Sequence, residues 1–313
     1  MIIKTMHEVK KFKLLISLVL VGCITICLAN ESNVNSNSLT QTKLNSSQVE
    51  SAHVVQMKAY VDKQDYNEAI NYGKTQYSLV KDSKMALYLG KSYFLTQNYQ
   101  QAIKYFQDSA NRGEALAMLA LGNIYGSGTG VPKNIPKAIY WYKKSIALGN
   151  TEAMNYLGLI YRDGVNGKSD YLMALDLFHL AASKNSAKGY FNLGYMYQNG
   201  IGVKTDYVVA IDYYTKAANL GDVYAMNNLG IIYSIGLGVP QNYPDALSWY
   251  MLAAAKADGN AQCNLGLFYF NGTGVPQNYT FAKTWFLEAQ KNGCKMADDY
   301  LGKIDKLNAS AAH

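Results

Sequence analysis

Apolar residues between about 83 and the C-terminus follow a helical period, and the whole pattern returns every 36 residues. In the segment 223–258, the residues from Ala225 to Tyr233 include an apolar set at i, i+4, i+7 and i+8, which is one face of a helix. A second set, from Ala246 to Ala257, follows with the spacing i, i+4, i+7 and i+11. Each unit therefore predicts two helices that pack through these faces.

Leu-Gly pairs mark the first helix of every unit, and their glycines are spaced by 32 residues once and then by 36 residues five times. The pairs stand at 89–90, 121–122, 157–158, 193–194, 229–230, 265–266 and 301–302. Equal steps of this kind indicate an array of one supersecondary unit. A glycine in the middle of a helix costs about 1 kcal/mol relative to alanine. We expect these glycines, with the Ala-Ala pairs of the second helices, to let neighbouring helices approach closely.

Glycine loops separate the two helices of most units. The loop 128–131 reads Gly-Thr-Gly-Val, and 200–203, 236–239 and 272–275 keep the Gly-x-Gly-Val pattern. Glycine favours the left-handed conformation that ends a helix, and the Asn or Asp that follows each loop predicts the N-cap of the second helix. The unit 151–186 has Gly-Val-Asn-Gly instead, and the unit 83–114 is shorter because it lacks the loop.

At these residues the sequence resembles the SEL-1-like repeat (SLR) family, which is related to the tetratricopeptide repeats. The resemblance implies an all-α fold, a right-handed α-solenoid of helix-turn-helix units. It divides the chain into two tetratricopeptide-like hairpins at 51–114, five SEL-1-like repeats at 115–294 and a C-terminal capping helix at 295–313. By the same resemblance, SLR proteins assemble complexes at membranes, and exported members in several bacteria that live inside host cells promote entry or trafficking.

The N-terminus has the pattern of an export signal. A lysine-rich start is followed by the apolar run Leu14 to Ile26, and small residues then precede a cleavage position before Asn30. This pattern predicts a signal peptide at 1–29. Leu20-Val-Gly-Cys23 also resembles a lipobox, in which Cys23 would be acylated, and the two alternatives remain open. Residues 30–50 contain almost no large apolar side chain, which predicts a disordered tether.

Composition and charge narrow the classes of protein. The 313 residues are 49% apolar, which is too much for a disordered chain, and the 26 glycines follow no Gly-X-Y triplet, which excludes collagen. The formal net charge is +7, but the first 29 residues contain four lysines and one glutamate. The remainder has 25 basic and 21 acidic residues, a bias too weak to predict nucleic-acid binding.

No motif in the sequence predicts catalysis, a cofactor or a metal site. The glycine loop at 126–130 joins two predicted helices and lacks the Lys-Ser/Thr of a phosphate loop. His53 and His179 have no partner at a ligand spacing, and Asp298 and Asp299 point about 100° apart on a helix. The motifs of serine hydrolases, β-lactamases and zinc proteases are absent from the sequence.

Cleavage before Asn30 would leave Cys263 and Cys294 as the two remaining cysteines, which an exported protein could oxidise to a disulfide. Cys263 lies on a predicted first helix and Cys294 at the entry to the next one, so the two are plausible neighbours. Shifted back by one 36-residue unit, Cys294 would stand five residues from Cys263, an axial offset of about 7 Å that is near the limit for a disulfide. The sequence leaves this pairing open.

Asn192, Asn228 and Asn264 form a column just before three successive Leu-Gly pairs, and Tyr156 has the same register. In tetratricopeptide proteins the equivalent position faces the concave groove, so these amides could bind an extended peptide. Alternatively, each Asn could satisfy backbone groups of a neighbouring glycine loop. The apolar residue that comes next on this stripe, such as Ile232, favours the second interpretation.

These observations predict a non-enzymatic scaffold or adaptor that binds other proteins or peptide segments and binds no nucleic acid. We expect it in the bacterial cell envelope or periplasm, or secreted, with membrane attachment only through a lipid at Cys23. The alternative is an envelope protein that binds or hydrolyses peptidoglycan or β-lactams, as some exported relatives are reported to do. That alternative needs a nucleophile or a fixed polar pocket.

Overall fold

The computed structural model describes residues 52–164 and 168–311, which belong to one compact unit. The predicted signal peptide, Cys23, the tether and the last two residues lie outside the described residues. No helix within 52–164 and 168–311 is long and apolar enough to cross a membrane.

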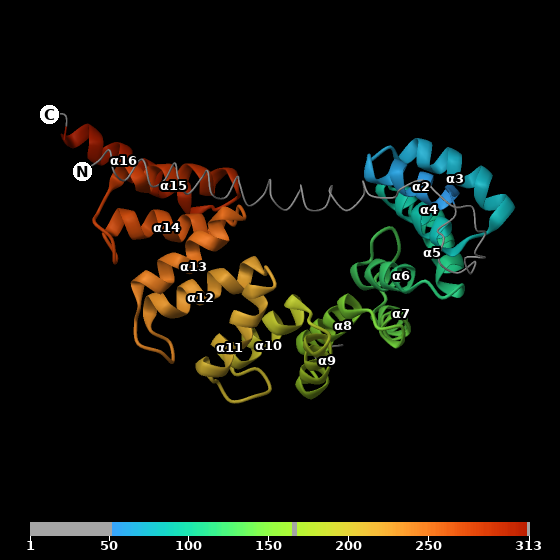
Figure 1. Cartoon of the computed structure of the whole chain (residues 1–313), viewed down its shortest axis with the longest axis horizontal. Coiled ribbons are helices and arrows are strands. Elements are labelled where there is room, and N and C mark those ends of the chain that lie inside the picture. Colours follow the sequence, from blue (N-terminus) through green and yellow to red (C-terminus); the bar gives the residue numbers. More distant parts are fainter. Residues whose placement is uncertain (1–51, 165–167, 312–313) are drawn as a thin grey trace, which may run out of the picture. The chain divides into compact units, whose positions relative to one another are not determined.

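The described part of the chain forms 15 helices, numbered α2 to α16 in Figure 1, and this confirms the all-helical fold. Their bounds are α2 Ala52–Asp62, α3 Tyr66–Val80, α4 Ser83–Leu95, α5 Tyr99–Asn111, α6 Ala115–Ser127, α7 Ile135–Ala147, α8 Thr151–Asp163, α9 Tyr171–Ser183, α10 Ala187–Asn199, α11 Tyr207–Asn219, α12 Val223–Ile235, α13 Tyr243–Ala255, α14 Gly259–Asn271, α15 Tyr279–Lys291 and α16 Met296–Ala311.

Successive helices pack as hairpins, and each hairpin packs against the next, as expected for an α-solenoid. We call α4, α6, α8, α10, α12 and α14 the first helices, and α5, α7, α9, α11, α13 and α15 the second helices. First helices also contact one another directly, as α8 contacts α10. The α2–α3 hairpin precedes this array and α16 follows it (Figure 1).

The glycine of the Leu-Gly pair makes room for an aromatic ring in the six units from 83 to 294, where the sequence analysis expected a close approach of neighbouring helices. A Cβ atom at Gly230 would lie 2.5 Å from the ring of Tyr250, on the second helix of the same unit. The equivalent glycines of the other five units face a Phe or Tyr ring in the same way, at 2.5–2.7 Å. Gly302 has no second helix after it, and a Cβ atom there would meet nothing within 4 Å.

A second kind of glycine explains the tyrosines that begin most second helices. Gly202, Gly238 and Gly274, in the inter-helix loops, have positive φ and lie against the tyrosine that starts the second helix of the preceding unit. A Cβ atom at Gly238 would meet Tyr207 at 2.4 Å. The helix α7 begins with Ile135 instead, and the sequence of the following unit has Asn166 at the corresponding loop position. Where the tyrosine at the start of the second helix is absent, the loop glycine that would lie against it is absent too.

The ends of the helices follow the predicted capping chemistry. The Oδ1 atom of Asn242 accepts a hydrogen bond from the N–H of Asp245, and Asn134, Asp206 and Asn278 cap their helices in the same way. The helical spacing predicted that the second helix of the unit 223–258 reaches Ala257, and this was wrong. The helix α13 ends at Ala255, and Ala257 has a left-handed φ of 62° at the position where Gly221 has 92° in the unit before.

Candidate functional site

Two adjoining cavities open between successive first helices and form the candidate site. The cavity between α4 and α6 has a volume of 280 Å³ and an apolar wall that includes Phe94, Phe106 and Ile124. The cavity between α6 and α8 has a volume of 520 Å³. Asn123 and Ser127 of α6 line both, so the two cavities share one wall.

The shared wall is held by a buried tyrosine. The hydroxyl of Tyr142, on α7, donates a hydrogen bond of 2.8 Å to Oδ1 of Asn123. Burial raises the pKa of Tyr142, and the neighbouring Tyr156 contributes to the same shift. The hydroxyl therefore stays protonated and holds the carbonyl oxygen of Asn123, which leaves the amide nitrogen of that side chain for another partner.

The α6–α8 cavity carries both signs of charge and an exposed aromatic ring. Lys133 and Asp163 line it, and Oδ1 of Asp163 accepts a hydrogen bond of 2.7 Å from Nε of Arg162. Tyr156 is 37% exposed and its ring stacks on that of Tyr142 with centroids 6.0 Å apart. Nζ of Lys188, on α10, lies 5.9 Å from the centroid of the Tyr156 ring. This cavity can hold a polar or aromatic side chain, whereas the α4–α6 cavity suits an aliphatic one.

The predicted Asn column joins first helices to one another. Nδ2 of Asn192 lies 3.4 Å from Oδ1 of Asn155, one unit earlier, and Nδ2 of Asn264 lies 3.0 Å from Oδ1 of Asn227. Asn192 is only 7% exposed, so little of its side chain is open to solvent.

Asn228, the third member of the column, is a neighbour of Tyr214 of the preceding second helix, whose hydroxyl donates a hydrogen bond of 2.7 Å to Oε1 of Gln198. Burial raises the pKa of Tyr214, and the neighbouring Asn228 partly opposes the rise. Asn192 and Asn264 bond to side chains of the preceding unit, and not to the glycine-loop backbone that the alternative interpretation assumed.

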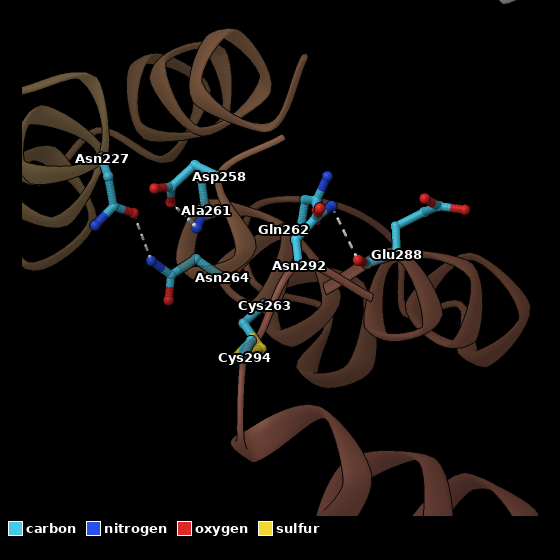
Figure 2. The surroundings of a disulfide bond; sticks show 9 residues. All are labelled: Asn227, Asp258, Ala261, Gln262, Cys263, Asn264, Glu288, Asn292 and Cys294. Carbon is cyan, nitrogen blue, oxygen red and sulfur yellow. Dashed lines mark hydrogen bonds between the residues drawn. A yellow bond between two sulfur atoms is a disulfide. The ribbon is translucent and has the colours of Figure 1, made fainter. Parts of the chain in front are cut away.

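Cys263 and Cys294 form a disulfide, with their Cα atoms 6.6 Å apart (Figure 2). Cys263 lies on α14, but Cys294 lies in the turn before α16, where its N–H donates to the carbonyl of Ala289. Cys294 thus lies at the entry to the next helix, as the sequence predicted. Because it is in a turn, the helical rise does not fix its position, and the expected axial offset does not prevent the bond. Figure 2 also shows the Asn227–Asn264 bond on the side of α14 toward the preceding unit.

The residues that line the shared wall, Asn123 and Ser127, belong to no column of recurring side chains, so the repeat pattern did not reveal them. Asn123 does not recur: its equivalents are Lys91, Leu159, Tyr195, Ile231, Leu267 and Lys303. The available signal was the one Asn in a column whose four positions from Leu159 to Leu267 are apolar or aromatic. Within the described ranges, no group of three His, Cys, Asp or Glu residues could hold a metal ion.

Comparison with known proteins gives a family match over most of the chain. The model described as Sel1 repeat matches six segments, 83–114, 115–150, 151–186, 187–222, 223–258 and 259–294. The first of these is the unit without the glycine loop, which the sequence analysis assigned to the tetratricopeptide type. A comparison with curated proteins gave no match.

Solved structures share the fold. One is a protective antigen present in uropathogenic Escherichia coli strains that displays an SLR fold, 35% identical with a TM-score of 0.65 over 75% of this chain. The match spans 51% of that antigen, about half its length. Another is a Sel1 repeat protein from Oxalobacter formigenes, 29% identical with a TM-score of 0.66, over 76% of this chain and 99% of that chain.

Proposed function

Because the chain belongs to the Sel1 repeat family, we propose that it is a non-enzymatic scaffold that binds extended segments of partner proteins. The proposed binding site is the pair of cavities that meet at Asn123. Repeat scaffolds of this kind are typical protein-interaction modules, since the stacked units offer an extended surface.

The sharing of one wall by the two cavities is the observation that supports this proposal most. Packed helices lie about 8–10 Å apart, and an extended peptide advances about 3.3 Å per residue. Side chains two or three residues apart on one peptide can therefore enter the two cavities together. The first would be aliphatic, to match Phe94 and Phe106, and the second polar or aromatic, to match Lys133, Asp163 and Tyr156. The free N–H groups of Asn123 would then bond the peptide backbone between them.

The disulfide supports a location outside the cytosol, because structural disulfides persist in oxidising compartments. This agrees with the export signal expected at residues 1–29, so the proposed location of the scaffold is the cell envelope or beyond it. The similar protein from uropathogenic Escherichia coli is a protective antigen. From this similarity we propose that the present scaffold takes part in contact with a host.

Site-specific photocrosslinking in cells tests the binding site. A photoreactive phenylalanine analogue replaces Tyr156, inside the candidate site, or Tyr140, which is 53% exposed on α7 and lines neither cavity. We expect envelope proteins to crosslink at position 156 and not at position 140. The substitution Asn123→Arg, which fills the shared wall, is expected to abolish the adducts from position 156. Equal crosslinking at both positions, or adducts that persist in the Asn123→Arg variant, would contradict the proposed site.

The enzymatic alternative has its own test. A protein that reacts with β-lactams forms a covalent adduct with a fluorescent penicillin, through a nucleophile that we do not assign to any residue. A stable stoichiometric adduct on the purified chain would overturn the scaffold proposal.

A further inference from the structure

The helix α7 differs in charge from every other helix in its position. It carries Lys137, Lys143 and Lys144 and no acidic residue. Each of the other second helices, and also α3, carries at least one carboxylate: Glu68, Asp108, Asp176, Asp212, Asp245 and Glu288. All three α7 lysines are exposed, and none has a carboxylate within 4.0 Å among the described residues.

This concentration of charge accounts for the net charge of the exported part of the chain. Between Glu114 and Glu152 the sequence has four lysines, the three on α7 and Lys133, and no acidic residue. Outside this segment, the chain from Asn30 onward has equal numbers of basic and acidic residues, 21 of each. The small excess of basic over acidic residues in the chain from Asn30 onward is therefore concentrated in a single hairpin.

Exposed apolar side chains lie among the α7 lysines. Lys137, Tyr140 and Lys144 are at i, i+3 and i+7, so they share one face of the helix, and Leu148 continues it at the next turn. Tyr140 and Leu148 are each 53% exposed. Nζ of Lys144 lies 5.7 Å from the centroid of the Tyr140 ring. We call Lys137, Tyr140, Lys143, Lys144 and Leu148 the α7 basic face.

We propose that the α7 basic face docks the protein on an anionic phospholipid surface. The three ammonium groups would pair with lipid phosphates, while the aliphatic stems of the lysines, the Tyr140 ring and Leu148 would enter the boundary between headgroups and acyl chains. Tyrosine suits this boundary because its ring is apolar and its hydroxyl is wet. The face contains none of the residues that line the two cavities, so a peptide and a membrane could be bound together.

The apolar side chains favour a membrane over another polyanion. Phosphates of a nucleic acid would satisfy the lysines but would leave Tyr140 and Leu148 in water. The next second helix extends the apolar character, because Met173 and Leu180 occupy the positions of Lys137 and Lys144 and are 42% and 41% exposed. A surface with cationic and apolar side chains side by side matches a bilayer interface more closely than a charged polymer.

Vesicle co-sedimentation tests the proposal with the chain that begins at Asn30, so that neither the signal peptide nor a lipid at Cys23 contributes. The probes are vesicles of phosphatidylcholine mixed with phosphatidylglycerol, and vesicles of phosphatidylcholine alone. The test variant replaces Lys137, Lys143 and Lys144 with Gln. The control variant replaces Lys184, Lys216 and Lys256, on or next to other second helices, and changes the net charge equally.

We expect binding to the anionic vesicles only, weakened by salt. Each lysine near an anionic surface contributes about fivefold to affinity, so the test variant is expected to bind about a hundredfold more weakly, while the control variant stays close to wild type. Tyr140→Ser is also expected to weaken binding to the anionic vesicles, without altering how that binding depends on salt. Equal losses in the two triple variants, or no binding to anionic vesicles, would overturn the proposal. Equally tight binding to a short DNA duplex would overturn it in favour of a general polyanion site.

Discussion

The contact between the mid-helix glycines and the aromatic rings makes a quantitative prediction at Gly230. Replacing this residue with Ala puts a Cβ atom 2.5 Å from Cδ1 and Cε1 of Tyr250, whose ring is 2% exposed and has little room to move. Overpacking of this kind costs about 1–3 kcal/mol, whereas the better helix propensity of Ala returns about 1 kcal/mol. We expect Gly230→Ala to lower the free energy of unfolding by up to about 2 kcal/mol.

Gly302 provides the matched control, because it follows Leu in the same register and a Cβ atom there meets nothing within 4 Å. Gly302→Ala is expected to stabilise by up to about 1 kcal/mol through propensity alone. Urea denaturation followed by far-UV circular dichroism measures both variants, and their difference isolates the steric term.

A second comparison tests whether the ring itself causes the loss. Tyr250→Leu removes the ring, and we expect it to cost less in the Gly230→Ala background than alone, since contacting residues couple. If Gly230→Ala and Gly302→Ala stabilise equally, the glycine does not make room for the ring and the reasoning is refuted.

Three further predictions concern a turn, the disulfide and pH. Ala257→Gly is expected to stabilise by about 1 kcal/mol because its left-handed φ of 62° strains a residue with a Cβ atom, and Gly221→Ala to destabilise similarly; equal urea midpoints would contradict this. Replacing Cys263 and Cys294 with Ser opens a link of sequence separation 31 and is expected to cost about 3–4 kcal/mol, whereas unchanged melting would show that the link does not constrain the unfolded chain. Burial raises the pKa of Tyr142, so its contribution to stability is full below about pH 10 and is lost as the pH rises through the raised value; Tyr142→Phe is expected to reduce the alkaline loss, measured as melting temperature against pH.

Repetition in the sequence predicted the helices, but it did not reveal their packing partners. The 36-residue period placed the five hairpins from α6 to α15 because the backbone pattern of caps and glycines is local. The partner of the Leu-Gly glycine lies 20 residues further along, as Gly230 and Tyr250 show, and both residues recur with the same period. A single sequence cannot show which of its columns are in contact. All columns recur with the same period, so the separation between any two of them is the same in every unit.

Features that occur once were the ones that sequence analysis missed or left open. The helical rise predicted an axial offset of about 7 Å between Cys263 and Cys294, whereas Cys294 lies in the turn before α16 and the disulfide forms. Asn123 was overlooked because no other unit repeats it. The lysines of α7 were averaged into a net charge too small to predict a partner. In a repeat protein, the shared residues build the scaffold and the exceptions distinguish one unit from another.

Two of these exceptions, Asn123 and the α7 lysines, lie in one hairpin, and this bears on how the two proposed sites relate. The unit 115–150 contains Asn123 and Tyr142 of the shared wall and also the α7 basic face. Tyr142 and Tyr140 are two residues apart on α7, so their side chains point about 160° apart around the helix axis, one toward the cavities and one toward solvent. A membrane bound at one side of α7 would therefore leave the cavities open at the other. Substitutions on the two sides should separate the functions: the Lys→Gln variant should keep the crosslinks from position 156, and Asn123→Arg should keep vesicle binding.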